Sequence, residues 1–172
     1  DVDTIFGKGG AMETFLEARD EGKVRFLGFS AHSVEAAMAL MDGFDFDTIL
    51  FPINYTTWYA GNFGPQVLDR AKEKGMGILA LKAMAKQPWT EDAENKVPNC
   101  WYEPLTDPEE AKQGLRFTLS HPVTAALPPG NEDLFSRALG LATGFKPLSK
   151  VEVEDIKEKG MAGSPIFKYP MA

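Results

Sequence analysis

The chain has 172 residues, a length that corresponds to one domain with a substantial core. Hydrophobic residues make up 44% and charged residues 25%, and this balance excludes a disordered or fibrous chain. The net charge of -7 argues against a nucleic-acid partner, because binding to phosphates requires a basic surface.

The single cysteine and the two histidines limit the redox and metal chemistry that we expect. Cys100 has no second cysteine for an internal disulfide, so a reducing compartment, the cytoplasm, is expected. The spacing of His32 and His121 shows no zinc pattern, and no metal site is predicted. No apolar stretch is long enough to cross a bilayer, so no membrane partner is expected.

Apolar periodicity predicts a chain in which strands and helices alternate. In chain order the predicted elements are a helix over Ala11 to Glu21, a strand over Val24 to Phe29, a helix containing Val34 to Met41, a strand over Thr48 to Ile53, a helix that starts at Pro65 and ends before Lys74-Gly75, a strand over Gly77 to Leu81, a strand over Val123 to Leu127, a helix over Glu132 to Ala142 and a final helix over Ser149 to Lys159. The strand runs are nearly unbroken in hydrophobicity, which suits strands buried on both faces. Ser149 and Glu152 form the pattern of a capping box. The alternation predicts a parallel sheet with right-handed crossovers.

Two segments of the predicted single domain, 1–172, interrupt this alternation. Residues 85–107 contain Trp89, Trp101 and Tyr102 among several prolines, and we expect an ordered loop excursion after the third strand. Residues 162–172 contain Pro165 and Pro170, and an extended tail is predicted there. The chain has no initiator methionine and reaches a helical pattern almost at once, so we expect it to start within something larger.

Four parallel strands with intervening helices fit two architectures. One is a small open doubly wound sheet, and the other is half of a (β/α)8 barrel. Periodicity leaves both open. In both, ligands bind beyond the carboxyl ends of the strands, so the residues that directly follow the predicted strands are the candidates for chemistry.

Polar residues follow the first three predicted strands. Ser30 and Asn54 have groups that can hydrogen-bond a carboxamide or a hydroxyl, and Lys82 can hold a phosphate. His32 is the local candidate for proton transfer. Each has a structural alternative: Ser30 or Ser33 as a helix cap, Asn54 as part of a turn, Lys82 as a solvated charge and His32 as a loop histidine.

The fourth predicted strand leads into Gly130-Asn131-Glu132-Asp133, which opens a helix. Free backbone amides at a helix start attract anions, although the same residues make an ordinary helix N-terminus. His121 is predicted to cap a helix C-terminus, and Cys100 is not expected to act as a nucleophile. We find no catalytic triad and predict no catalytic residue in the chain.

Four blocks of sequence carry a resemblance to a known family. They are Gly22-Lys23-Val24-Arg25 leading to Gly28-Phe29-Ser30, Asp47 to Tyr55, Ala71 to Lys82, and Leu115-Arg116-Phe117 through Val123 to Gly130. In this order they resemble the fifth to eighth strand regions of the aldo/keto reductases. The resemblance covers the chain from about Ala11 to Ala142.

The resemblance implies the second half of a (β/α)8 TIM barrel, four parallel strands alternating with helices, plus a C-terminal helix. It implies an NAD(P)-dependent oxidoreductase that reduces aldehyde or ketone carbonyls by hydride transfer. The family's catalytic aspartate, tyrosine, lysine and histidine lie on the first half, so the isolated chain is expected to be inactive. The implied partners are a small carbonyl substrate and either the missing N-terminal half of the barrel or a second copy.

The same resemblance implies a cofactor-binding wall for NADP or NAD. Its residues would be Ser30, His32, Asn54, Leu81, Lys82, Pro129, Gly130, Asn131 and Asp133. Ser30 and Asn54 would meet the nicotinamide carboxamide, and the Gly130 loop would receive the adenosine end. The acidic residues after Gly130 favour a free ribose hydroxyl, whereas Arg137 lies where it can reach a 2′-phosphate, so both cofactors stay open.

Two alternatives to a reductase remain at this point. One is a non-catalytic nucleotide-binding half-barrel, which would associate through its unpaired edge strands. The other is an interaction domain that uses the aromatic residues of 85–107 as its surface.

Overall fold

A computed structural model describes residues 2–94 and 96–170 of the chain. Residue 95, in the predicted excursion 85–107, and residues 171–172, at the end of the predicted tail, lie outside the described residues. The elements are α1 (Val2–Phe6), α2 (Ala11–Asp20), β1 (Gly28–Ser30), α3 (Val34–Gly43), β2 (Thr48–Pro52), α4 (Tyr55–Tyr59), α5 (Pro65–Glu73), β3 (Gly77–Leu81), β4 (Ala85–Pro88), β5 (Tyr102–Pro104), α6 (Pro108–Leu119), β6 (Ala125–Ala126), α7 (Glu132–Ala142) and α8 (Lys150–Ala162).

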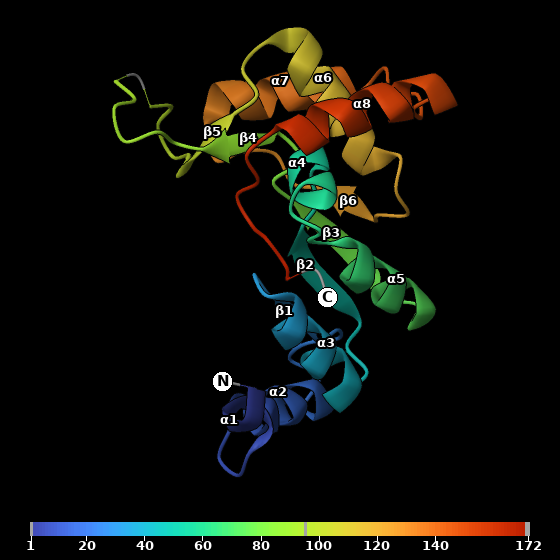
Figure 1. Cartoon of the computed structure of the whole chain (residues 1–172). Helices are drawn as coiled ribbons and strands as arrows, with labels where there is room; N and C mark the ends of the chain where they lie inside the picture. The colour runs from blue at the N-terminus through green and yellow to red at the C-terminus, as the bar shows by residue number, and fades with distance from the viewer. Residues whose placement is uncertain (1, 95, 171–172) are drawn as a thin grey trace.

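The main sheet has four parallel strands in the order β1-β2-β3-β6. β2 and β3 are in register over five residues, from Thr48 opposite Gly77 to Pro52 opposite Leu81. Figure 1 shows this sheet in the middle of the molecule, with α1 to α3 near the β1 edge and α6 to α8 beyond the other end. The parallel sheet with alternating helices is therefore confirmed.

The two faces of the sheet differ in burial. Ile49, Phe51 and Ile78 point to one face, are at most 3% exposed and pack with the apolar sides of α3 and α5. Leu50 and Leu79 point to the opposite face and are only half-buried. The prediction of strands buried on both faces is thus wrong for one face. In a closed barrel that face would pack against side chains from the remaining strands.

Both edge strands are shorter than predicted. The strand predicted over 24–29 forms only at Gly28–Ser30, and Val24 and Phe26 are 36% and 66% exposed. The strand predicted over 123–127 forms only at Ala125–Ala126. Each edge strand pairs with one neighbour, so fewer ladder hydrogen bonds hold its ends than in β2 and β3.

Helix boundaries follow local signals in the sequence. α2 begins at Ala11 as predicted, and α5 has Pro65 in its first turn. The capping box at the start of α8 is present, with the Ser149 hydroxyl accepting from the Glu152 amide and the Glu152 carboxylate accepting from the Ser149 amide. The short helix α4, which begins after Asn54, was not predicted.

Arg116 on α6 joins this helix to the start of α8. Its guanidinium contacts both carboxylate oxygens of Glu152, at 2.5 and 3.1 Å, and donates to the Lys146 and Pro147 carbonyl oxygens. Bidentate pairing of this kind fixes geometry as well as charge. The Arg116 hydrogen bond, followed by those from Ser149, lowers the pKa of Glu152 to about 2.

This ion pair predicts a pH dependence of stability. The folded state favours the Glu152 carboxylate, so its contribution is fully present above the ordinary pKa of 4.5 and is lost as the pH falls toward about 2. We expect Glu152→Gln to flatten the dependence of Tm on pH across that interval. Glu154→Gln is the matched control on the same helix, because Glu154 is exposed and forms a longer ion pair, with Lys157 at 3.6 Å. Equal slopes for the Glu152→Gln variant and the unmodified chain would contradict the assignment.

Candidate functional site

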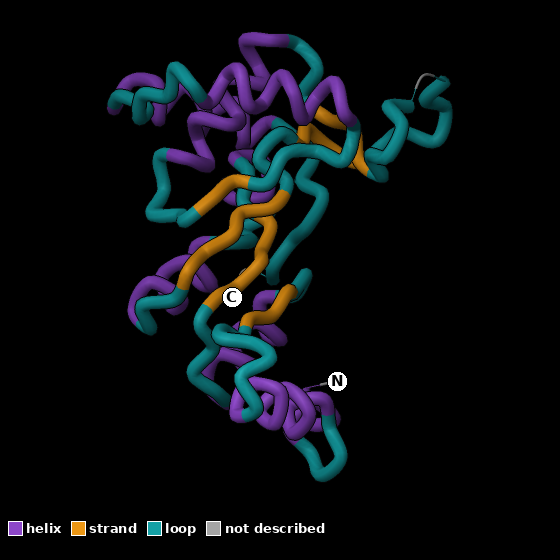
Figure 2. The backbone as a smooth tube through the Cα atoms, turned by 180° about the vertical axis from the view of Figure 1, so that it is seen from behind, coloured by secondary structure: helices purple, strands orange, loops and turns teal. Residues whose placement is uncertain are grey.

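The candidate site lies at the carboxyl ends of the parallel strands, which face the same way because the strands share one direction. Figure 2 shows the strands of the main sheet side by side, with loops beyond their ends. Four segments come together there: the loop after β1, the loop after α4, the excursion 85–107 and the chain after α8.

The loop after β1 presents Ser30 and His32. Ser30 is exposed at the end of the strand, and the helix cap is Ser33, whose hydroxyl accepts from the Ala36 amide at 3.1 Å. The side chain of Ser30 is therefore not used as the cap of α3. The ring of His32 lies 5.2 Å from the ring of Phe167. This brings the first predicted site loop into contact with the C-terminal segment.

Asn54 follows β2 and is buried, with 1% of its surface exposed. Its Oδ1 accepts from the Thr57 amide at 2.9 Å, so Asn54 caps α4. The structural alternative expected for Asn54 was a turn, and the observed role is a helix cap. Its amide Nδ2 is also buried and has no hydrogen-bond partner among the described residues. A buried unpaired donor is costly, and a ligand oxygen is one group that would satisfy it.

Lys82 follows β3 in a backbone conformation that lysine seldom adopts, with φ at 66°. Its Nζ lies 5.2 Å from the ring centroid of Trp101 and 5.0 Å from that of Tyr102. No described carboxylate or hydrogen-bond acceptor contacts this amine in the structure. Partial burial lowers the pKa of Lys82. Leu81, directly before it, is half-buried and lies on the same face of the sheet as Leu79.

The loop before α7 combines a helix cap with contacts from the excursion. Asn131 caps α7, its Oδ1 accepting from the Leu134 amide at 3.1 Å. Gly130 is exposed and lies against Asn99, whereas Pro129 is buried. The Asn131 backbone also hydrogen-bonds to the thiol of Cys100, whose pKa is raised overall by burial. The excursion thus closes over this loop.

The charges around α7 bear on the cofactor. Glu132 and Asp133 stand exposed in its first turn. Arg137 donates a hydrogen bond to the Thr106 carbonyl oxygen. Among residues 2–94 and 96–170 no arginine forms an ion pair with either carboxylate, and Arg137, which the sequence placed near a 2′-phosphate, is bonded to Thr106.

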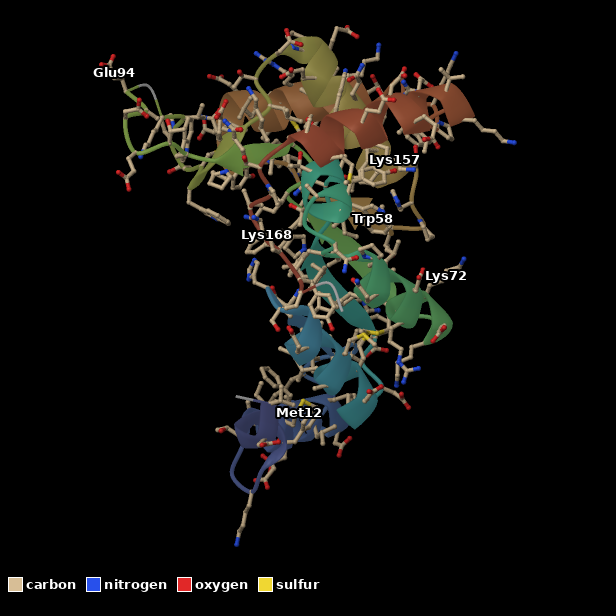
Figure 3. The ribbon with its side chains drawn as sticks, viewed as in Figure 1. Met12, Trp58, Lys72, Glu94, Lys157 and Lys168 are labelled. Atoms are coloured by element: carbon tan, nitrogen blue, oxygen red, sulfur yellow. The ribbon has the colours of Figure 1, made fainter. Side chains whose placement is uncertain are left out.

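The excursion contains two strands that the sequence did not predict. β4 and β5 pair antiparallel, with Ala85 opposite Pro104 and a register shift before Gln87. The Trp89 indole donates to the Cys100 carbonyl oxygen at 2.8 Å and fixes the return of the loop. Figure 3 shows Glu94 at the far tip of the loop, away from the strand ends.

Two aromatic residues of the site were missed by sequence reasoning. Phe63, in the loop after α4, stacks on Phe167 with ring centroids 5.1 Å apart. Phe167 also meets Trp101 at 5.8 Å. Their only signal in the sequence was the aromatic content of the loop and tail, which carries no period.

His121 lies outside this site. Its Nδ1 pairs with the Phe117 carbonyl oxygen at 2.8 Å at the end of α6, as predicted for a C-terminal cap. Burial lowers its pKa. It therefore provides an internal reference for His32.

The positive charge of Lys82 should have a measurable effect on the pKa of His32. The pKa of His32 is lowered first by partial burial and second by the positive charge of Lys82. We expect Lys82→Met to raise the pKa of His32, followed by NMR titration of its ring protons, and to leave His121 unchanged. Equal changes at both histidines, or none at His32, would refute the proximity.

A hollow of about 250 Å³ lies elsewhere, between α6 and α8, where Gln113, Glu152 and Lys159 line it. Two of its polar groups pair with each other, the Lys159 amine and the Gln113 side-chain oxygen at 2.7 Å, and Glu152 pairs with Arg116. We place the candidate site at the strand ends because a cation and a buried amide lie there that have no polar partner in the described part of the chain.

Within residues 2–94 and 96–170, no group of three or more His, Cys, Asp or Glu side chains is arranged to hold a metal ion. Among the helices of this same part of the chain, none combines the length and the hydropathy needed to span a membrane.

Comparison with known proteins finds matches at the level of structure. No family model matches the chain, and no curated protein does. The aldo-keto reductase AKR11C1 from Bacillus halodurans matches in its holo form with a TM-score of 0.58 over 92% of this chain, at 14% identity, and in its apo form with a TM-score of 0.59 over 95%, at 15% identity. The glycerol dehydrogenase AKR11B4 from Gluconobacter oxydans matches with a TM-score of 0.51 over 92% of the chain, at 16% identity.

The chain has the fold of part of an aldo-keto reductase. These reductases are (β/α)8 barrels, and the chain spans 56% to 61% of their length. The face of the sheet that carries Leu50 and Leu79 is only half-buried, and β1 and β6 each pair with a single described strand. Both features agree with that partial coverage. Of the two architectures that periodicity left open, part of a barrel is therefore the correct one.

Proposed function

We propose that the chain is the cofactor-binding half of an NAD(P)-dependent oxidoreductase of the aldo/keto reductase type, which reduces aldehyde or ketone carbonyls. The observation that carries the proposal is the fold, combined with polar groups at the ends of two neighbouring strands, β2 and β3, that have no partner among the described residues. Lys82 has no anionic partner among the described residues, and the amide of Asn54 is buried without an acceptor. These groups complement a phosphate and a carboxamide.

Each residue of the proposed cofactor-binding wall would contact a different part of the cofactor. Ser30 and the Asn54 amide would bond the nicotinamide carboxamide, Leu81 would line the ring and Lys82 would face the pyrophosphate. The residues of the Gly130 loop, Pro129, Gly130, Asn131 and Asp133, would receive the adenosine end, where a helix start favours negative charge. The bound nucleotide would supply the hydride, and the proton donor would come from the part of the barrel outside this chain.

Charge at the adenosine end favours NAD in this proposal. Glu132 and Asp133 are exposed there, and carboxylates pair with a free ribose hydroxyl rather than with a 2′-phosphate. Arg137, the nearest candidate for the phosphate, is bonded to the Thr106 carbonyl oxygen. NADP would require Arg137 to release that bond.

Titration with NADH and NADPH, followed by intrinsic tryptophan fluorescence, tests the proposal. Trp101 lies beside Lys82, so a saturable change with at least one nucleotide is expected. The chain alone should reduce no carbonyl substrate. If neither nucleotide changed the tryptophan fluorescence, the result would contradict the proposal and favour an interaction domain. If the chain alone both bound a nucleotide and reduced a carbonyl, the result would contradict the proposal that the proton donor lies outside this chain.

The proposed partner of the chain is the remaining part of the barrel, with a second copy as its substitute in isolation. β1 and β6 each have one unpaired edge, and Phe15 and Phe26 near the β1 edge are 53% and 66% exposed. Light scattering should therefore detect dimers or larger species, and a stable monomer would count against an open barrel edge. With its single buried cysteine, the chain fits the cytoplasm as its compartment.

A further inference from the structure

Three side chains at the strand ends surround a single ring, and the space that they border is here called the aromatic slot: Phe63, Trp101 and His32. The ring of Phe167 fills it. Phe167 stacks on Phe63 with an interplanar angle of 23° and a centroid distance of 5.1 Å, and meets Trp101 edge-on at 5.8 Å. The ring of His32 lies 5.2 Å from that of Phe167 at a tilt of 32°. The stack continues inward, because Phe63 in turn lies parallel to Phe51 at 4.9 Å.

Phe167 belongs to residues 165–169, here called the strap. The Tyr169 amide donates to the Gly61 carbonyl oxygen at 2.8 Å. Gly61 is required at this point, because a Cβ there would collide with the Phe167 carbonyl oxygen and touch Pro165. In Figure 1 the strap descends from the end of α8 past α4 toward β1, and Figure 3 places Lys168 on this path. The strap is thus held in one place across the strand ends.

The slot also borders a cation. The amine of Lys82 lies 5.2 Å from the ring of Trp101, one of the residues that contact Phe167. A flat ring in the slot would therefore have a positive charge close by for a phosphate. Ring and phosphate together are the chemistry of a nucleotide.

We propose that Phe167 is an internal occupant of a nucleotide ring site, and that the strap is autoinhibitory: a ligand ring enters the slot only when Phe167 leaves it. The ring is nicotinamide if the proposed function holds, and that identification rests on it. The slot itself does not, because the residues that form it all belong to this chain.

Binding of mononucleotides tests the proposal. Nicotinamide mononucleotide and AMP are titrated by calorimetry into the unmodified chain, Phe167→Ala and Phe167→Leu. Removal of a stacked, half-buried ring should tighten binding of at least one mononucleotide by about tenfold in Phe167→Ala, with an intermediate gain in Phe167→Leu. Ribose 5-phosphate, which has no ring, should gain nothing. Phe135→Ala, an exposed aromatic residue on α7, is the matched control and should bind like the unmodified chain.

A second measurement follows the strap directly. The Tyr169 amide should exchange with solvent faster when a mononucleotide saturates the unmodified chain, since its bond to Gly61 opens with the strap. Equal or weaker binding of both mononucleotides by Phe167→Ala, an equal gain for ribose 5-phosphate, or binding with unchanged exchange at Tyr169 would overturn the proposal. Tighter binding of AMP alone supports the slot but not a nicotinamide ring. The reductase proposal stands or falls separately, on the titration with dinucleotides.

Discussion

Replacement of Phe117 by alanine is expected to lower the free energy of unfolding by about 3–5 kcal/mol, the usual cost of removing a buried phenylalanine. Phe117 is 2% exposed on α6. Its ring meets those of Tyr55, Trp58 and Tyr59 on α4 at 6.3, 6.0 and 5.7 Å. The cavity left by the substitution would separate α6 from α4, and urea unfolding followed by circular dichroism measures the loss.

The control for this prediction is Phe135→Ala on α7. Phe135 is 45% exposed, so its removal should change the free energy of unfolding by no more than about 0.5 kcal/mol. A loss below about 1 kcal/mol for Phe117→Ala would mean that the packing between α4 and α6 contributes little to stability.

Replacement of Lys82 by methionine should weaken binding of the preferred nicotinamide dinucleotide by about 10- to 100-fold. A hydrogen bond to a charged group contributes about 1.5–3 kcal/mol, which corresponds to that range of Kd. Methionine keeps an unbranched apolar chain over Trp101 and Tyr102 and removes only the charge. The titration that monitors tryptophan fluorescence gives the two dissociation constants.

Lys86→Met is the matched control, since it removes a lysine from the same excursion. Lys86 pairs with Glu103 at 3.1 Å, and its side chain is 42% exposed. Its loss should leave the dissociation constant unchanged. Equal weakening by both substitutions would show a general effect of net charge, and no weakening in Lys82→Met would remove Lys82 from the site.

The sequence predicted the centre of the sheet better than its edges. The run Gly77–Leu81 forms β3 with the predicted bounds, because a strand between two neighbours has ladder bonds on both sides. The equally apolar run from Val24 has one neighbour, and its first residues leave the sheet. Hydrophobicity reports that a segment is suited to burial, but whether a neighbouring strand exists is a property of the whole fold.

Local signals along the chain could be read from the sequence, whereas long-range contacts at the candidate site could not. The cap at the start of α8 follows from residues within one helical turn. The contacts of Lys82 with Trp101, and of His32 with Phe167, join segments distant in sequence and follow no period. The left-handed backbone at Lys82 likewise has no signature in a lysine. The strand ends could therefore be proposed as the candidate site from the sequence, but the contacts among the aromatic groups around it could not.

Hydrogen exchange of the chain with and without NADH or NADPH, resolved by peptide mass spectrometry, tests the central claim most directly. The account predicts protection in the segments that follow the strands, around His32, Asn54, Lys82 and Asn131, with little change in α2 or α8. Protection confined to the hollow between α6 and α8, where Gln113 and Lys159 lie, would contradict it. So would the absence of any protection by either nucleotide.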